Sequence, residues 1–232
     1  MKKVTPVILI CLLTAISCNK GQVLKINGRV DNPFFEGSKA YIIGSSVTGN
    51  PKEDSAVIRN SRFTFTLPAD SMAVKSIMIP PKGQEGVQDL IFIGEPGTLD
   101  VVMSLKSHSS GTRLNRLVME WKEDNFNYDS VQNELYYQAG NPGITRERHD
   151  SIMKASAEID SSYMSRNIEI MNDNLTNGIG LFFFKFYYDN LPKEVKISVL
   201  EKTGSLFLNA DKQVLSRVMF DPEIQKSNFV TK

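Results

Sequence analysis

Hydrophobic and polar residues alternate in short runs through the first half of the chain. Phe63, Phe65 and Leu67 alternate with polar residues in one such run. Alternation with a period of two is typical of strands that have one buried face and one solvated face. Strands are therefore predicted at 23–30, 39–44, 56–59, 62–67, 74–79, 89–93 and 98–105.

A two-residue turn, Asn60-Ser61, is expected to join two of these strands as a hairpin, although Ser is a weaker turn residue than Gly. Segments rich in proline and glycine separate other strands, at 80–83 and at 94–97. Seven short strands at this spacing predict an antiparallel β-sandwich over residues 23–110.

The hydrophobic period changes to that of a helix after residue 110. Hydrophobic residues share one helical face between 114 and 135, although the segment 125–127 is able to bend or break a helix. The segment 141–143 is a stop signal, and Thr145 suits the N-cap of a second helix that reaches about Leu175. The wide hydrophobic arc of this second helix indicates burial against two neighbours rather than a position at a membrane surface.

The segment 179–191 is hydrophobic on nearly every side, and we expect it to form the central helix of a bundle. Pro192 begins a further helix that ends at Gly204, where a left-handed cap is expected. A last helix is predicted at about 209–220.

Together these patterns predict the fold class α+β. An N-terminal antiparallel β-sandwich at 23–110 is followed by a C-terminal helical bundle at 111–221 and by a flexible tail at 222–232. A hydrophobic fraction of 41% suffices for one large domain or for two small ones.

The N-terminus has the layout of an export signal. Two lysines precede a hydrophobic run at 7–13, which is too short to span a membrane because a span takes about 20 residues. The segment 15–18 reads Ala-Ile-Ser-Cys and resembles the lipobox of bacterial lipoproteins, with Ala15 in place of the commoner leucine. A cleaved signal with an ordinary cysteine and a plain membrane anchor are the alternatives.

The lipobox resemblance implies that residues 1–17 form a signal peptide that is removed. Cys18 is then alkylated with lipid, and residues 18–22 form a lipidated tether. Two or three acyl chains make a stable membrane anchor. By the same resemblance, Asn19 favours the outer membrane, and no acidic run follows it to direct the protein to the cell surface. The periplasmic leaflet of the outer membrane is therefore expected.

Charge and cysteine usage exclude several functions. The chain has 27 Lys and Arg, two of which leave with the signal, against 26 Asp and Glu, so the mature protein is nearly neutral. Its basic residues are scattered, which leaves no electrostatic case for binding nucleic acid. Cys11 leaves with the signal and Cys18 is acylated, so stability must come from core burial rather than from disulfides.

Several short motifs follow one another along residues 22–220. They are Ile26-Asn27-Gly28-Arg29-Val30, the segment from Asp54-Ser55-Ala56-Val57 to Phe63-Thr64-Phe65, Gly94-Glu95-Pro96-Gly97-Thr98, Gly111-Thr112-Arg113-Leu114-Asn115 and Asn177-Gly178-Ile179-Gly180. Their order resembles a family of Gram-negative envelope lipoproteins, the thiol:disulfide oxidoreductases. In that family a β-rich domain of unknown function and a helical linker precede a thioredoxin-like domain.

Full-length members of that family carry a Cys-x-x-Cys motif in the thioredoxin-like domain. This chain ends at Lys232 and has no such motif, so we expect neither the oxidoreductase activity nor a cofactor. We expect a non-catalytic binding or scaffold module whose sandwich recognises an envelope protein or a glycan. The alternative is an auxiliary to thiol–disulfide exchange that works in trans with a separate thioredoxin-like protein. No spacing of carboxylates supports a hydrolase.

Other residues that could carry chemistry have simpler interpretations. His108 lies in a polar segment, 107–111, that is expected to be a loop capping the next helix, and His149 lies on a charged helix face. Both are interpreted as surface histidines, because they lack the spacing of zinc ligands. Trp121 could stack on a sugar, but its place on the hydrophobic stripe favours core packing. No metal site and no catalytic residue is predicted.

Four Asp-Ser-hydrophobic tripeptides recur along the chain. Each is similar to the O-glycosylation site of envelope proteins in some Gram-negative bacteria. Their serines are Ser55, Ser71, Ser130 and Ser151. Asp and Ser also mark turns and helix starts, so matches by chance are the alternative.

Overall fold

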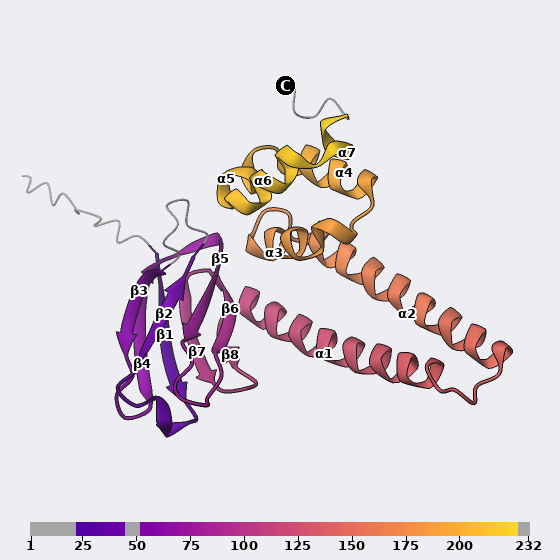
Figure 1. Cartoon of the computed structure of the whole chain (residues 1–232). Coiled ribbons are helices and arrows are strands. Elements are labelled where there is room, and N and C mark those ends of the chain that lie inside the picture. Colours follow the sequence, from indigo (N-terminus) through magenta and orange to yellow (C-terminus); the bar gives the residue numbers. More distant parts are fainter. Residues whose placement is uncertain (1–21, 45–51, 227–232) are drawn as a thin grey trace, which may run out of the picture.

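The computed structural model describes residues 22–44 and 52–226, and within them eight strands form two four-stranded sheets. One sheet has the order β4-β1-β7-β8 and the other has the order β3-β2-β5-β6. Figure 1 shows the two sheets stacked as the layers of a sandwich. The strands are β1 (Val23–Val30), β2 (Lys39–Ile43), β3 (Lys52–Val57), β4 (Arg62–Pro68), β5 (Asp70–Ile79), β6 (Gln88–Gly94), β7 (Gly97–Met103) and β8 (His108–Ser110).

Alternation in the sequence produces the sandwich core. In β4, Phe63, Phe65 and Leu67 are buried while the residues between them are exposed. Side chains from both sheets form one hydrophobic cluster, which also contains Phe35 from the short helix η1 (Pro33–Phe35). Among the described strands, β1 and β7 pair in parallel and the other pairs are antiparallel. The predicted α+β class, with a two-sheet β region before the helices, is confirmed.

The turn at Asn60-Ser61 forms as predicted, but the hairpin does not extend beyond it. Both residues have positive φ, 52° and 57°, as a type I′ turn requires. Arg59 and Arg62 exchange two backbone hydrogen bonds, and the pairing stops there. β3 pairs with β2 whereas β4 pairs with β1, so the expected pairing of the two flanking strands is wrong. The buried side chain of Ile58 enters the core between the layers, where the chain passes from one sheet to the other.

The segment 107–111, expected to be a polar loop, contains the strand β8 instead. β8 pairs antiparallel with β7 and forms an edge of its sheet. Ser107 and Ser109 are buried whereas His108 is exposed, so burial alternates without any alternation in hydrophobicity. A prediction based on hydrophobic period misses such a strand, because its buried positions hold small polar residues.

Helix α1 (Arg113–Ala139) projects from the sandwich, and α2 (Arg146–Asp173) runs back beside it from their joined far end to the next helix (Figure 1). We call this pair the helical hairpin. The segment 125–127 does not break α1, which is continuous. Thr145 caps α2 as predicted, because its side chain accepts a hydrogen bond from the backbone N–H of Arg148.

Polar side chains join the two helices of the hairpin. The amide of Gln132 on α1 donates to the backbone oxygen of Ser156 on α2 at 3.1 Å. The Ser156 hydroxyl donates in return to the amide oxygen of Gln132 at 2.6 Å. Both side chains are buried, and because buried polar groups require partners, this exchange sets the register of α1 against α2.

Asn115 ties the start of α1 to the edge strand β6. Its side chain donates to the backbone oxygen of Ile93 at 2.9 Å and accepts from the Ile93 N–H at 2.8 Å. The carboxylate of Glu95 accepts a hydrogen bond from the N–H of Leu114 in the first turn, where negative charge is favourable. The helical hairpin is therefore attached directly to the sandwich.

Helix α3 (Gly178–Tyr187) is the central helix, and eight of its ten residues are buried, as expected. Gly178 allows the helix to approach β5 closely, because a Cβ at this position would lie 2.9 Å from the backbone oxygen of Ser71. The single helix predicted at 179–191 divides at Tyr187, and the chain continues as the 3-10 helix η2 (Tyr188–Asn190).

Short helices complete the described part of the chain. They are α4 (Lys193–Thr203), α5 (Leu206–Ala210), α6 (Lys212–Phe220) and α7 (Pro222–Gln225). α4 begins after Pro192, as predicted. Gly204 follows it with a positive φ, 55°, but its ψ of −126° lies outside the left-handed helical region, so the expected left-handed cap is wrong. The last helix, predicted at about 209–220, divides before Asp211, whose carboxylate caps α6.

A buried ion pair holds the end of the described chain. Asp221 caps α7 and accepts hydrogen bonds from Lys196 at 3.1 Å and from the Tyr188 hydroxyl at 3.0 Å. Ile224 of α7 is fully buried. The described part of the expected tail, residues 222–226, is therefore packed on the helices before it.

Candidate functional site

One side of α3 stays open while the rest of the helix is buried. Lys185 and Phe186 are the residues of α3 that are not buried, and 51% of Phe186 is exposed. The Phe186 ring lies edge-on to Trp121 and to Tyr187, with centroids 4.9 Å apart in both pairs. The two buried rings hold the half-exposed ring in one orientation, so it offers a rigid hydrophobic surface for contact.

A chain of hydrogen bonds holds these rings in place. The Trp121 indole N–H donates to the Tyr187 hydroxyl at 2.9 Å. The hydroxyl oxygens of Tyr187 and Tyr163 lie 3.1 Å apart, and the Tyr163 hydroxyl donates to Oδ1 of Asn125 at 2.9 Å. This chain joins α1, α3 and α2, so it ties the three helices together where they meet.

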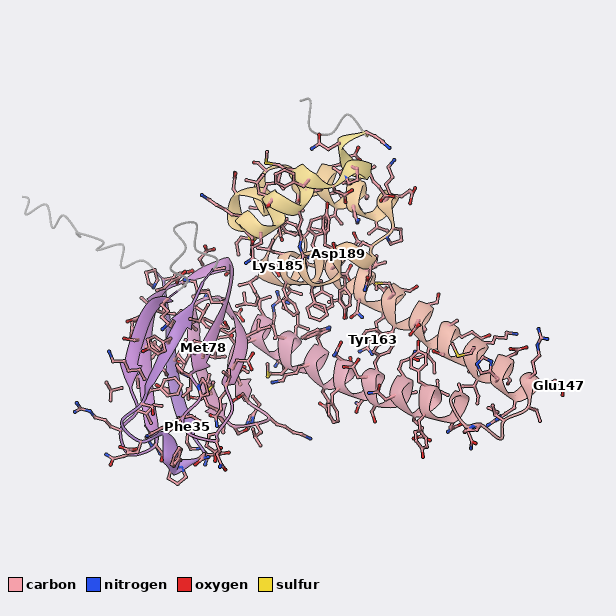
Figure 2. The ribbon with its side chains drawn as sticks, viewed as in Figure 1. Phe35, Met78, Glu147, Tyr163, Lys185 and Asp189 are labelled. Atoms are coloured by element: carbon pink, nitrogen blue, oxygen red, sulfur yellow. The ribbon has the colours of Figure 1, made fainter. Side chains whose placement is uncertain are left out.

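The three helices border an open cleft of about 610 Å³, which we call the hairpin cleft. Figure 2 shows Tyr163 between α1 and α2 at this place. The rings of Tyr163 and Tyr128 stack, with centroids 4.0 Å apart and planes 8° from parallel. The volume lies in the range of ligand-binding pockets. The lining includes Tyr128, Asp129, Asp160, Tyr163, Phe186 and Tyr187.

Two carboxylates, those of Asp129 on α1 and Asp160 on α2, give the hairpin cleft a negative charge. Asp160 accepts hydrogen bonds from the Tyr128 hydroxyl at 2.6 Å and from the Gln132 amide. Asp129 accepts from the Asn125 amide at 3.0 Å. These donors are neutral, and neither carboxylate forms an ion pair with a described residue. No described Lys, Arg or His lines the cleft either.

Two tyrosines of the cleft, Tyr128 and Tyr187, have raised pKa values. Burial, and then the hydrogen bond to Asp160, raises the pKa of Tyr128 above its ordinary value. Burial, and then the hydrogen bond with Tyr163, likewise raises the pKa of Tyr187. The protonated Tyr128 hydroxyl is a neutral donor, so it satisfies Asp160 without cancelling its charge.

Phe186 also lines a second hollow, of about 400 Å³, between α3, α6 and strands β5 and β6. We call it the sheet-side hollow. Its three basic residues are each paired with a described carboxylate, so its charges are matched. The pairs are Lys75 with Glu53 at 2.5 Å, Lys185 with Asp211 at 2.7 Å and Arg217 with Asp189 at 3.8 Å.

Residues 24–118 match a family model described as Domain of unknown function (DUF4369). No curated protein matches the chain. The DUF4369 match covers the sandwich and the first residues of α1, and it ends before the residues that line the hairpin cleft. The match supports the predicted β-rich domain of unknown function over residues 24–118. The relationship to thioredoxin-family lipoproteins stays a prediction.

The four predicted modification sites are spread over separate elements, inside and outside the DUF4369 match. Ser55 on β3, Ser130 on α1 and Ser151 on α2 are exposed, and Ser71 on β5 is half-buried. Cys18 lies outside the described residues, as does the whole predicted signal peptide. Lipidation and glycosylation therefore both stay predictions.

The two histidines lie at the surface and the tryptophan lies in the core, as predicted. His108 and His149 are exposed, and Trp121, at 9% exposure, packs in the core. Within residues 22–44 and 52–226, no group of three or more His, Cys, Asp or Glu side chains could hold a metal ion. In the same part of the chain, no helix has the length and hydrophobicity to cross a membrane.

Sequence reasoning missed Phe186, Asp129 and Asp160, all of which lie beyond the DUF4369 match. Phe186 falls in a segment that is hydrophobic on nearly every side, and the charged Lys185 beside it is the signal of a solvent-facing side. Asp160 lies on the hydrophobic stripe of α2, four residues before Met164. A charged residue in such a stripe indicates that polar contacts interrupt the hydrophobic packing, as the hydrogen bonds to Asp160 do here.

Proposed function

We propose that this protein is a membrane-anchored periplasmic lipoprotein that acts as a non-catalytic binding module for an envelope partner. Its binding surface is the region around Phe186, with the hairpin cleft and the sheet-side hollow. The observation that carries the proposal is the half-exposed Phe186 ring, supported by Trp121 and Tyr187 and flanked by two hollows. Aromatic residues are enriched at contact sites and contribute much of the binding energy there.

The arrangement of the helices supports binding with little ordering cost. Hydrogen bonds between Trp121, Tyr187 and Tyr163 already join the three helices that border the cleft. A surface that is ordered before binding loses little conformational entropy when a partner docks. For this reason the proposal places recognition on the helices, whereas the sequence alone suggested the sandwich.

The ionisable groups of the cleft support binding rather than proton transfer. A general acid or base works best when its pKa lies near the operating pH. The pKa values of Tyr128 and Tyr187 are raised above the ordinary tyrosine value, which takes them further from neutrality. Asp129 and Asp160 are held by neutral hydrogen-bond donors, as suits fixed contacts for a ligand.

The membrane anchor is tested by replacing Cys18 with Ala. We expect the wild-type protein to incorporate labelled palmitate and to fractionate with the outer membrane. The Cys18→Ala variant should remain an unacylated precursor. Uptake of label by this variant would contradict the lipoprotein assignment.

The binding surface is tested by capture from envelope extracts with the acylated protein. We expect a reproducible partner to be retained by the wild type and lost with Phe186→Ala. The control is Tyr137→Ala, because Tyr137 is 82% exposed on α1 and does not line either hollow. Thermal unfolding of both variants checks that they remain folded. Equal capture by wild type and Phe186→Ala, or no reproducible partner, would count against the proposal.

A further inference from the structure

No described basic residue lines the hairpin cleft or forms an ion pair with its two carboxylates. Asp129 and Asp160 accept hydrogen bonds from the neutral side chains of Asn125, Tyr128 and Gln132. The basic residues of the sheet-side hollow are, by contrast, each paired with a carboxylate. Two like charges on one cleft repel each other, and a bound cation relieves that repulsion.

Aromatic rings accompany the two carboxylates. Phe186 offers a half-exposed ring, and the stacked pair of Tyr128 and Tyr163 lines the same cleft. Ring faces attract cations, and a guanidinium group both stacks on a ring and donates two hydrogen bonds to a carboxylate. A neutral sugar also stacks on rings, but it leaves both charges uncompensated. The chemistry of the cleft therefore favours a cationic group.

The shape of the cleft favours a side chain presented by another protein. The cleft is open to solvent along its lining from α1, α2 and α3, rather than closed around a small molecule. Its volume, about 610 Å³, admits a long side chain together with the backbone on either side of it. A segment of a partner can thus lie across the hairpin and insert one residue.

We propose that the hairpin cleft binds an arginine or lysine side chain exposed on an envelope protein. Asp129 and Asp160 are the carboxylate partners of this cation, and Phe186 is the ring on which it stacks. The inference rests on the proposed binding function and names the chemistry of the partner that the cleft accepts.

The test compares a short peptide with blocked termini, in which one arginine is the only charged residue, with the same peptide in which citrulline replaces that arginine. Trp121 is the single tryptophan of the chain and packs against Phe186, so its fluorescence reports occupancy of the cleft. We expect the arginine peptide to bind about tenfold more tightly than the citrulline peptide, and added salt to weaken its binding. Isothermal titration calorimetry measures both affinities.

Matched variants distinguish binding of the arginine in the cleft from a general effect of the protein's negative charge. Asp129→Asn keeps the shape of the side chain and should lower the affinity for the arginine peptide about three- to tenfold. Glu158→Gln makes the same charge change on the exposed face of α2, outside the cleft lining, and should leave the affinity unchanged. Protein made in a host that does not glycosylate it removes any effect of a glycan on Ser130.

Several outcomes would overturn the inference. They are equal binding of the two peptides, no binding of the arginine peptide, and an affinity that Asp129→Asn does not change. A neutral oligosaccharide that binds where the arginine peptide does not would assign the cleft to glycans. If the peptide fails while Phe186→Ala still abolishes capture from extracts, the proposed function stands and the cationic ligand alone is wrong. If Phe186→Ala leaves capture intact, the proposed function itself fails.

Discussion

The indole N–H of Trp121 on α1 donates a hydrogen bond of 2.9 Å to the hydroxyl of Tyr187 on α3, across 66 residues of sequence. The same indole lies edge-on to Phe182 and to Phe186, with centroids 4.8 and 4.9 Å away. Trp121 is therefore part of the core of the helical region and also supports the ring of the open surface. Trp121 therefore links the stability of the core to the proposed binding surface.

Replacing Trp121 with Phe should lower the free energy of unfolding by about 2 kcal/mol, because the hydrogen bond to Tyr187 and part of a buried ring are lost. Denaturant unfolding followed by circular dichroism measures the change. Phe126→Leu, at an exposed position of the same helix, is the control and should change stability by about 0.5 kcal/mol at most. Equal stabilities of Trp121→Phe and wild type would show that the indole contributes nothing to the core.

Acid should destabilise the end of the helical region. Burial opposes the ionisation of Asp221, but the backbone N–H of Glu223, Lys196 and the Tyr188 hydroxyl outweigh it and hold the pKa of Asp221 below its ordinary value. A lowered pKa in the folded state stabilises the fold above the unfolded value, about 3.9, and this contribution is lost as the pH falls through the folded pKa. The unfolding free energy contributed by this group should therefore be constant from about pH 7 to 5 and fall below about pH 4.

The variant Asp221→Asn isolates this effect. It leaves the buried ammonium of Lys196 without its countercharge, so we expect a loss of about 3 kcal/mol at neutral pH and a smaller further loss in acid. Asp150→Asn, at an exposed site on α2, is the matched control and should follow the wild-type pH curve. A pH dependence that survives unchanged in Asp221→Asn would contradict the assignment. Denaturant titrations at each pH provide the measurement.

Ser61→Gly should stabilise the protein by about 0.5 kcal/mol. Ser61 has a φ of 57°, which costs a non-glycine residue roughly 1 kcal/mol, and glycine avoids that cost while losing some chain entropy. The backbone N–H of Ser61, which donates to the Glu36 carboxylate, is retained in the variant. Thermal unfolding should show a raised midpoint. Ser110→Gly, in β8 with an ordinary strand conformation, should lower the midpoint and serves as the control.

The glycosylation hypothesis predicts that protein from the native host is heavier than its lipidated polypeptide. Because a transferase needs an accessible hydroxyl, we expect the modification at Ser55, Ser130 or Ser151, which are exposed, rather than at the half-buried Ser71. Intact-mass measurement of single Ser→Ala variants assigns the site. A native mass that equals the lipidated polypeptide alone would contradict the hypothesis.

Much of the fold could be predicted because local patterns determine local structure. The alternation of Phe63, Phe65 and Leu67 correctly predicts β4, and Thr145 correctly predicts the start of α2. The turn at Asn60-Ser61 is also correct, since few dipeptides accept two positive φ angles. Strand β8 could not be found in this way, because hydrogen bonds to β7 rather than hydrophobic alternation define it.

The sequence by itself determined most of the element types, β8 excepted, together with the order of β region and helices and the buried position of Trp121. Only the tertiary structure decided that the strands flanking Asn60-Ser61 belong to different sheets. Each strand pairs with the partner that gives the more stable ladder, and that partner is distant in the sequence. It also decided the candidate site. Asp129 on α1 and Asp160 on α2 line one cleft, and Phe186 is exposed because neither the hairpin nor the sandwich covers that side of α3. The exposure of a side chain depends on which other elements pack against it. The sequence of one segment does not specify those elements.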